Sequence, residues 1–194
     1  MIRNEIVLIL GKKRKGKTTL AFNLLEDRRF IFLDPKGQLA KNNLLVTPRM
    51  EKFDQKEFLA FLRGDRFYFV VNGRVEICNE CLNRLAALIK KRPEIMLDFV
   101  LVVDESQFFT HSNYIYPALN DLVAHGGQHE LDIVFIVREA HEVHKFIRSQ
   151  TDTIISFQQD EPASLDWCEK IKAGCRERLG SLEFGEYEYL RRLD

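Results

Sequence analysis

Eight residues near the N-terminus have the types and spacing of a phosphate-binding loop. The run Gly11-Lys12-Lys13-Arg14-Lys15-Gly16-Lys17-Thr18 fits the pattern G-x-x-x-x-G-K-[ST]. Its two glycines allow backbone angles that residues with a Cβ resist, so the loop amides can converge on phosphate oxygens. In such a loop Lys17 reaches the β and γ phosphates, and the Thr18 hydroxyl ligates Mg²⁺. We therefore predict that residues 11–18, with Thr19 beside them, bind ATP, and that Mg²⁺ is a cofactor.

An acidic pair supplies the second set of groups that a triphosphatase needs. Asp104 and Glu105 directly follow the apolar run Phe99-Val100-Leu101-Val102-Val103. At the end of a buried strand, Asp104 can hold Mg²⁺ and Glu105 can orient and deprotonate an attacking water. The alternative is a strand that simply ends in solvent. The loop upstream favours the catalytic interpretation.

Two further polar residues also stand at the ends of apolar runs. Arg138 follows Leu131 to Val137, and a guanidinium there can sense phosphate or stabilise transition-state charge. The alternative is a surface arginine that pairs with Glu139 or Glu142. Asp34, before Pro35-Lys36-Gly37, is a candidate accessory residue, and a plain turn explains it equally simply.

Alternating strand and helix patterns surround these residues and predict a mainly parallel α/β sheet covered on both faces. The expected strands are residues 6–10, 29–33, 67–71, 99–103, 131–137 and 153–157. The expected helices are residues 19–26, 54–61, 76–91, 117–124, 142–148 and 161–173. Residues 38–52 and 106–116 show no period and are interpreted as surface connections. A short C-terminal β-hairpin is expected around Gly185, from Leu182–Phe184 and Tyr187–Leu190.

Composition sets limits on the class of protein. With 194 residues, the chain is expected to form a single domain, 1–194. Lys+Arg and Asp+Glu are both 29, so zero net charge gives no global case for nucleic-acid binding. Any such contact would need a local patch, such as Lys12 to Lys17 or the region of Lys52, Lys56 and Arg63. The apolar runs are too short for a transmembrane segment, and no signal peptide is evident, so a cytoplasmic location is expected.

Four cysteines raise the question of a metal site. Cys78 and Cys81 have metal-ligand spacing, whereas Cys168 and Cys175 are separated by six residues, which is not a standard zinc spacing. Reduced thiols on helices are the favoured interpretation, and zinc at Cys78 and Cys81 is the alternative.

Taken together, the motifs resemble the FtsK/HerA superfamily of P-loop motor ATPases. Within it, the chain is most similar to the small genome-packaging ATPases of membrane-containing viruses and phages. The resemblance spans about residues 5 to 160. The order and spacing of the motifs are more specific than the loop or the acidic pair alone. These motifs are Gly11 to Leu20, Phe32 to Gly37, Leu101 to Glu105, Leu131 to Val143 and Gln150 to Phe157.

The resemblance implies a RecA-like, three-layer αβα P-loop fold with an extra central strand. It also implies a motor that hydrolyses ATP to translocate or package double-stranded DNA, working as a homo-oligomeric ring of five or six subunits. Capsid or membrane proteins of a virus would then be partners, in host cytoplasm or in the virion. Family members often carry an arginine before the sensor strand that acts across the subunit boundary. Here residues 125–129 hold none, which leaves Arg138 and Arg148 as candidates.

Three other functions fit parts of the sequence. One is an assembly or secretion ATPase like the zonula-occludens-toxin-like proteins of filamentous phages, which usually carry a membrane segment. Another is a small-molecule kinase, although no arginine-rich lid is evident and Asp104-Glu105 favours water as the acceptor. The third is a non-catalytic nucleotide-binding module, against which the complete motif set argues. Stimulation of ATPase activity by DNA would separate the packaging motor from the first of these.

Overall fold

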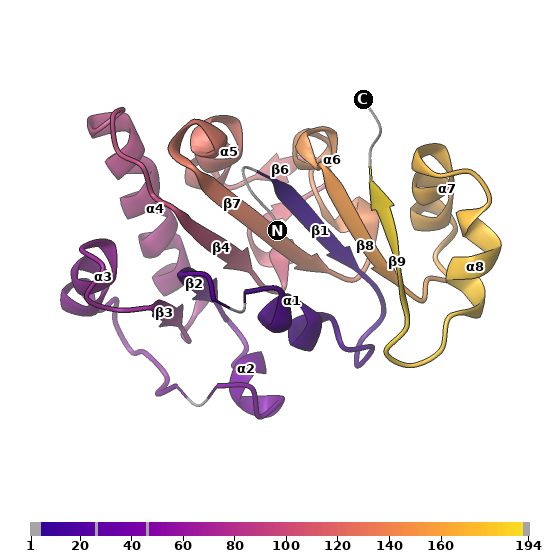
Figure 1. Cartoon of the computed structure of the whole chain (residues 1–194), viewed down its shortest axis with the longest axis horizontal. Helices are drawn as coiled ribbons and strands as arrows, with labels where there is room; N and C mark the ends of the chain where they lie inside the picture. Colours follow the sequence, from indigo (N-terminus) through magenta and orange to yellow (C-terminus); the bar gives the residue numbers. More distant parts are fainter. Residues whose placement is uncertain (1–4, 26, 46, 192–194) are drawn as a thin grey trace.

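A seven-stranded sheet forms the centre of the molecule in the computed structural model, which describes residues 5–25, 27–45 and 47–191 (Figure 1). The strand order is β3-β2-β4-β7-β1-β8-β9, and every neighbouring pair is parallel except β8 with β9. The predicted, mainly parallel α/β fold is confirmed. The strands are β1 (Ile6–Leu10), β2 (Phe30–Leu33), β3 (Tyr68–Val71), β4 (Phe99–Val103), β7 (Leu131–Val137), β8 (Thr153–Phe157) and β9 (Tyr187–Arg191).

Helices cover both faces of this sheet and produce three layers. On one face, α1 (Lys17–Leu25) and α2 (Gln38–Lys41) pack through Ala21, Leu25 and Leu39. The larger core lies on the other face. Burial on both sides explains why the central strands are uniformly apolar. The larger core is covered by α3 (Gln55–Leu62), α4 (Val75–Lys91), α5 (Pro117–His125), α6 (Lys145–Gln150), α7 (Pro162–Ile171) and α8 (Cys175–Ser181).

Strand β7 lies between β1 and β4, as the family resemblance implies. Leu10 is paired with Val137, and Val103 with Phe135, so the three strands end close to one level. Because parallel strands share their carboxyl edge, the segments that follow β1, β4 and β7 emerge side by side. This arrangement brings the phosphate loop, the acidic pair and Arg138 to one edge of the sheet.

Several segments differ from the prediction. Residues 38–52 contain α2, and residues 106–116 contain a 3₁₀ turn (Ser106–Phe108) and a small hairpin of β5 (Thr110–His111) and β6 (Tyr114–Ile115). The helix predicted at 142–148 is instead a 3₁₀ turn (Ala140–Glu142) followed by α6, and α8 was not predicted. These elements are too short to show a hydrophobic period. At Gly174, a φ of +75° separates α7 from α8.

The C-terminal antiparallel pairing is present, but its partner differs from the expected one. Residues 182–184 are not a strand, and β9 pairs instead with β8, with Tyr187 opposite Phe157. Burial of Leu190 in the larger core anchors β9 at the sheet edge. The chain therefore ends its sheet on a strand that runs against all the others.

The cysteines belong to the core. All four are free and buried; Cys78 and Cys81 lie on α4, where burial raises the pKa of Cys78 to about 12. Within the described residues, neither belongs to a group of three potential metal ligands. All four cysteines lie on helices, as expected, with Cys168 on α7 and Cys175 on α8. No helix in the described part of the chain is long and apolar enough to cross a lipid bilayer.

Candidate active site

The loop after β1 is shaped by left-handed backbone angles and by contact with β8. Gly11 and Gly16 have φ values of +147° and +98°. A Cβ on Gly11 would lie 2.6 Å from the Cβ of Phe157, so only glycine fits against that strand. The N–H of Gly11 also donates to the carbonyl oxygen of Arg138, at 3.3 Å. The loop is therefore held against both neighbours of β1 before any ligand arrives.

Lys17 lies across the opening of this loop. Its ammonium group donates to the carbonyl oxygens of Gly11 and Lys12, the latter at 2.8 Å. Burial lowers the pKa of Lys17 to about 8, although Asp104 and Glu105 act to raise it. A partly desolvated ammonium held by weak neutral acceptors binds strongly to an anion that replaces them.

Asp104 and Thr18 face each other at the start of α1. The Thr18 hydroxyl donates to Oδ2 of Asp104 at 3.4 Å, and the N–H of Glu105 donates to Oδ1 at 2.8 Å. Asp104 is almost fully buried, and burial raises its pKa to about 7. A divalent cation beside this carboxylate would stabilise its ionised form and so lower the pKa again. Two hard oxygen donors next to a phosphate loop suit Mg²⁺, so the residues fit the expected ion.

Glu105 is held in a fixed position by two residues that the sequence did not single out. Its backbone is left-handed, with φ +50° and ψ +50°, an uncommon conformation for a residue with a Cβ. The ammonium of Lys36 lies 3.0 Å from Oε2 of Glu105, and the side-chain amide of Gln107 donates to the same oxygen. Burial acts to raise the pKa of Glu105, but the two hydrogen bonds and the positive charges of Lys36 and Lys17 together lower it. The carboxylate is therefore kept ionised.

Arg138 pairs with a glutamate, as one of its two predicted interpretations expects, and also lies at the cavity. Its guanidinium pairs with Glu142 at 3.2 Å, and its backbone N–H donates to the same carboxylate at 3.1 Å. The side chain nevertheless lines the cavity that Lys17 and the acidic pair share. The carbonyl oxygen of Arg138 accepts from Gln159 at 3.1 Å as well as from Gly11.

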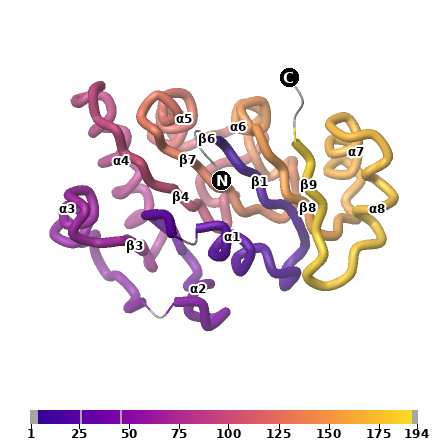
Figure 2. The backbone as a smooth tube through the Cα atoms, viewed as in Figure 1, coloured from indigo at the N-terminus to yellow at the C-terminus, as the bar shows by residue number. Residues whose placement is uncertain are grey.

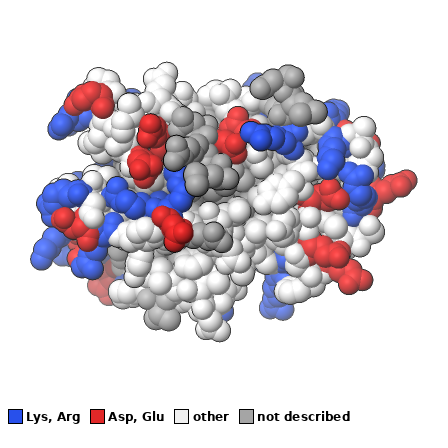
Figure 3. Space-filling view, viewed as in Figure 1, with Lys and Arg blue, Asp and Glu red and all other residues white. Residues whose placement is uncertain are grey.

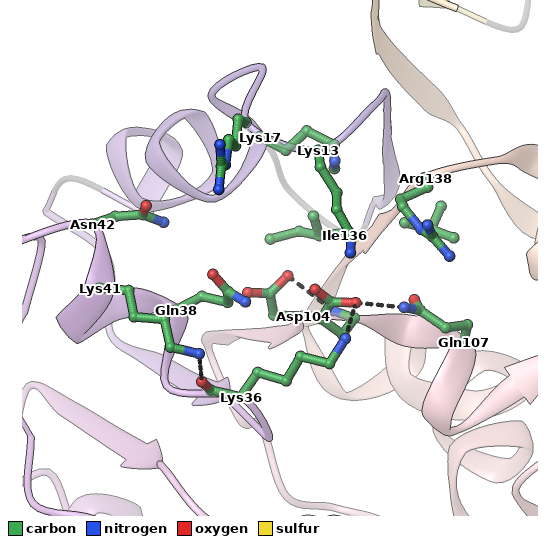
Figure 4. Close-up of a pocket in the computed structure, with 13 residues that line it drawn as sticks. Lys13, Lys17, Lys36, Gln38, Lys41, Asn42, Asp104, Gln107, Ile136 and Arg138 are labelled. Atoms are coloured by element: carbon green, nitrogen blue, oxygen red, sulfur yellow. Dashed lines mark hydrogen bonds and ion pairs between the residues drawn. The ribbon is translucent and has the colours of Figure 1, made fainter.

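These groups surround one cavity of about 470 Å³ at the carboxyl edge of the sheet. Figure 4 shows Lys13 and Lys17 on one side of it and Asp104 on the other, with Arg138 and Gln107 at one end. Six cationic side chains against two acids make the cavity suited to a polyphosphate. The lining residues are Lys13, Arg14, Lys17, Lys36, Gln38, Lys41, Asn42, Asp104, Glu105, Gln107, Ile136, Val137 and Arg138.

Solved structures give an independent comparison, whereas no protein-family model and no curated protein matches the chain. The genome packaging NTPase B204 of Sulfolobus turreted icosahedral virus 2, in complex with sulfate, has a TM-score of 0.72 at 20% identity, over 99% of this chain and 93% of that one. VirB4 of Thermoanaerobacter pseudethanolicus has a TM-score of 0.64 at 12% identity, over 98% of this chain and 87% of that one. The chain has the fold of an FtsK/HerA-type P-loop ATPase.

Two further results bear on this ATPase fold. The B204 NTPase was also solved with the ATP analogues AMPPCP and ATP-gammaS. The N-terminal domain of zonular occludens toxin from Neisseria meningitidis matches less closely, with a TM-score of 0.50 at 16% identity, over 82% of this chain and 79% of that one. The structural neighbours thus include both of the protein types that the sequence motifs resemble.

Asp34 and Arg148, the two predicted accessory residues, lie outside the cavity. Asp34 is buried and accepts the backbone N–H groups of Gln38 and Leu39, at 2.6 and 3.0 Å, where it supports the start of α2. Its contacts match the turn interpretation. Arg148 lies on α6 with its guanidinium 6.0 Å from the ring centroid of Trp167. Within the phosphate loop, Lys13, Arg14 and Lys17 line the cavity, and Lys12 pairs with Asp160. The other predicted loop residues are not among the lining residues: Gly11, Lys12, Lys15, Gly16, Thr18 and Thr19.

A substitution of Lys36 tests whether ATP hydrolysis requires the Glu105 carboxylate to be held in place. The change Lys36→Met should lower kcat roughly tenfold, because a catalytic group that is slightly misplaced loses one to two orders of magnitude. Adding Gln107→Ala should lower it further, since Gln107 then no longer holds the carboxylate. Steady-state ATPase assays measure both effects. The matched control is Lys56→Met, an exposed lysine on α3, and equal rates for Lys36→Met and wild type would contradict the prediction.

Proposed function

We propose that this chain is a Mg²⁺-dependent ATPase, acting as a single domain, that translocates or packages double-stranded DNA. One observation carries the proposal: Lys17, Asp104, Glu105 and Arg138 come from three different strand ends and line the same cavity. The chain shares its fold with a viral genome packaging NTPase, and this supports DNA translocation or packaging as the work that ATP hydrolysis drives.

Each residue has a role that follows from its position. The loop amides and Lys17 bind the β and γ phosphates, while Thr18 and Asp104 would hold Mg²⁺. When bound, the ion neutralises charge on the phosphate oxygens. Glu105 accepts a proton from water as the water oxygen bonds to the γ phosphorus and the bond to ADP breaks.

Arg138 is proposed to stabilise the charge that develops on the transferred phosphoryl group. Its guanidinium is bound to Glu142 on one side and lines the cavity on the other. A terminal phosphate competes with that carboxylate for the guanidinium, because both are oxygen anions. Arg148, which packs beside Trp167, stays a candidate for a contact across a subunit boundary.

The motor activity requires assembly and a DNA contact. We propose a ring of five or six copies, anchored to capsid or membrane proteins of a virus, in host cytoplasm or in the virion. On the face shown in Figure 3, basic and acidic side chains are intermixed at both ends. Because the net charge is zero, we propose that a few local basic residues contact DNA. Residues 38–52 and 106–116 are the proposed pore or partner contacts.

An ATPase assay with and without duplex DNA tests this function, run beside a mass measurement of the assembly. The expected result is Mg²⁺-dependent ATP hydrolysis that DNA accelerates, by a ring-sized oligomer. Hydrolysis without any DNA stimulation would instead favour an assembly or secretion ATPase. The structural likeness to the zonular occludens toxin domain is the observation behind that second candidate.

A further inference from the structure

Exposed aromatic side chains occur on and just before β9, at the edge of the sheet, and two of them, Tyr187 and Tyr189, lie next to each other. Phe184, Tyr187 and Tyr189 are 74%, 39% and 50% exposed. Tyr187 and Tyr189 alternate along β9 and therefore share one face of the sheet, with their ring centroids 5.6 Å apart. Exposed rings of this size cost free energy in water, so their grouping points to a ligand.

Contacts within the chain link Tyr187 to the phosphate loop. Phe157, at the end of β8, lies under the loop: its Cβ blocks a side chain at Gly11, and its ring is 3.6 Å from a Cβ placed on Gly16. On its other side, the Phe157 ring is 5.4 Å from the ring of Tyr187. A single buried ring thus separates Tyr187 from the loop. In Figures 1 and 2 the chain entering β9 runs beside the loop between β1 and α1.

The strand order indicates on which side of the loop the terminal phosphate of a bound nucleotide lies and on which side its base lies. The acidic pair and Arg138 follow β4 and β7, so the terminal phosphate lies on that side of the loop. A triphosphate that the loop encircles must leave its nucleoside on the opposite side. That side is occupied by β8 and β9, where Tyr187 presents a partly exposed ring.

We propose that Tyr187 is the stacking surface for the base of the bound nucleotide. This inference rests on the proposed ATP site and adds a base subsite to it. An aromatic ring stacks on the face of a base and makes few contacts with the polar groups at the edge of that base. Stacking therefore tolerates different purines. ATP and GTP are therefore expected to depend on Tyr187 to the same degree.

Calorimetric titration with ATP and with inorganic triphosphate separates base binding from phosphate binding. The change Tyr187→Ala should weaken ATP and GTP about tenfold, the loss expected for one base–aromatic stack, and leave inorganic triphosphate unchanged. Tyr187→Phe should restore wild-type affinity. The matched control is Tyr68→Ala, a similarly exposed tyrosine on β3 at the opposite edge of the sheet.

Two outcomes would overturn the base subsite. Wild-type ATP affinity in Tyr187→Ala shows that the base lies elsewhere. An equal loss for ATP and inorganic triphosphate shows that Tyr187 only supports the loop through Phe157. Failure of the nucleotide site itself has a different signature, because the wild-type protein would then bind neither ligand.

Discussion

Replacing Lys17 with Met is expected to weaken ATP binding about a hundredfold and to stop hydrolysis. The ammonium is partly desolvated and, among the described residues, donates to two backbone carbonyl groups, which it can exchange for phosphate oxygens. Charge-assisted hydrogen bonds in such a setting contribute up to about 3 kcal/mol. Titration of labelled ATP measures the loss of affinity, and phosphate release measures the loss of hydrolysis.

Lys15→Met is the matched control for Lys17, because Lys15 belongs to the same loop but does not line the cavity. It should bind ATP within a few fold of wild type. Thermal unfolding of the Lys17→Met protein should remain near that of wild type, since burial of the ammonium is itself unfavourable. Full ATP affinity in Lys17→Met would remove the loop as the phosphate site.

The change Glu105→Gln should have the opposite pattern: ATP binding is kept and hydrolysis is lost. The amide has the same shape and can still accept from Lys36, but it cannot take a proton from water. Removal of a general base typically costs between about a hundred- and ten-thousandfold in rate. Single-turnover assays measure the chemical step directly, and equilibrium titration measures binding.

Glu80→Gln provides the control for Glu105, because Glu80 lies on α4 and pairs with Arg84 at 2.7 Å, outside the cavity lining. Its hydrolysis rate should equal that of wild type. If Glu105→Gln still hydrolysed ATP at the wild-type rate, another group would have to activate the water. Lys36 and Gln107 would then hold a carboxylate with no part in the chemistry.

The sequence predicted most accurately the parts of the fold that burial dictates. Strands 6–10, 99–103, 131–137 and 153–157 match β1, β4, β7 and β8 residue for residue, because strands covered on both faces are uninterrupted apolar runs. The polar groups at their ends then shared one edge of the sheet by topology alone. This is why the loop, the acidic pair and Arg138 could be brought together from sequence.

Contacts made by loops were harder to predict. Lys36 was part of a recognised motif, but its partner became evident only once β2 was seen beside β4. Gln107 stands two residues from Glu105, where only the left-handed turn at Glu105 brings the two side chains together. The partner of β9 was wrong because a local turn at Gly185 gave the same strand signal as a long-range pairing with β8.

The carbonyl oxygen of Arg138 connects the tip of β7 to α8 through Gln159. It accepts from Gly11 and from Gln159, and the backbone N–H of Gln159 donates in turn to Leu179 on α8, at 3.1 Å. A displacement of the tip of β7 during turnover must therefore stretch one of these bonds or pull α8 along with it. These hydrogen bonds form a short path by which a displacement at the proposed phosphate site would reach the outer helical layer.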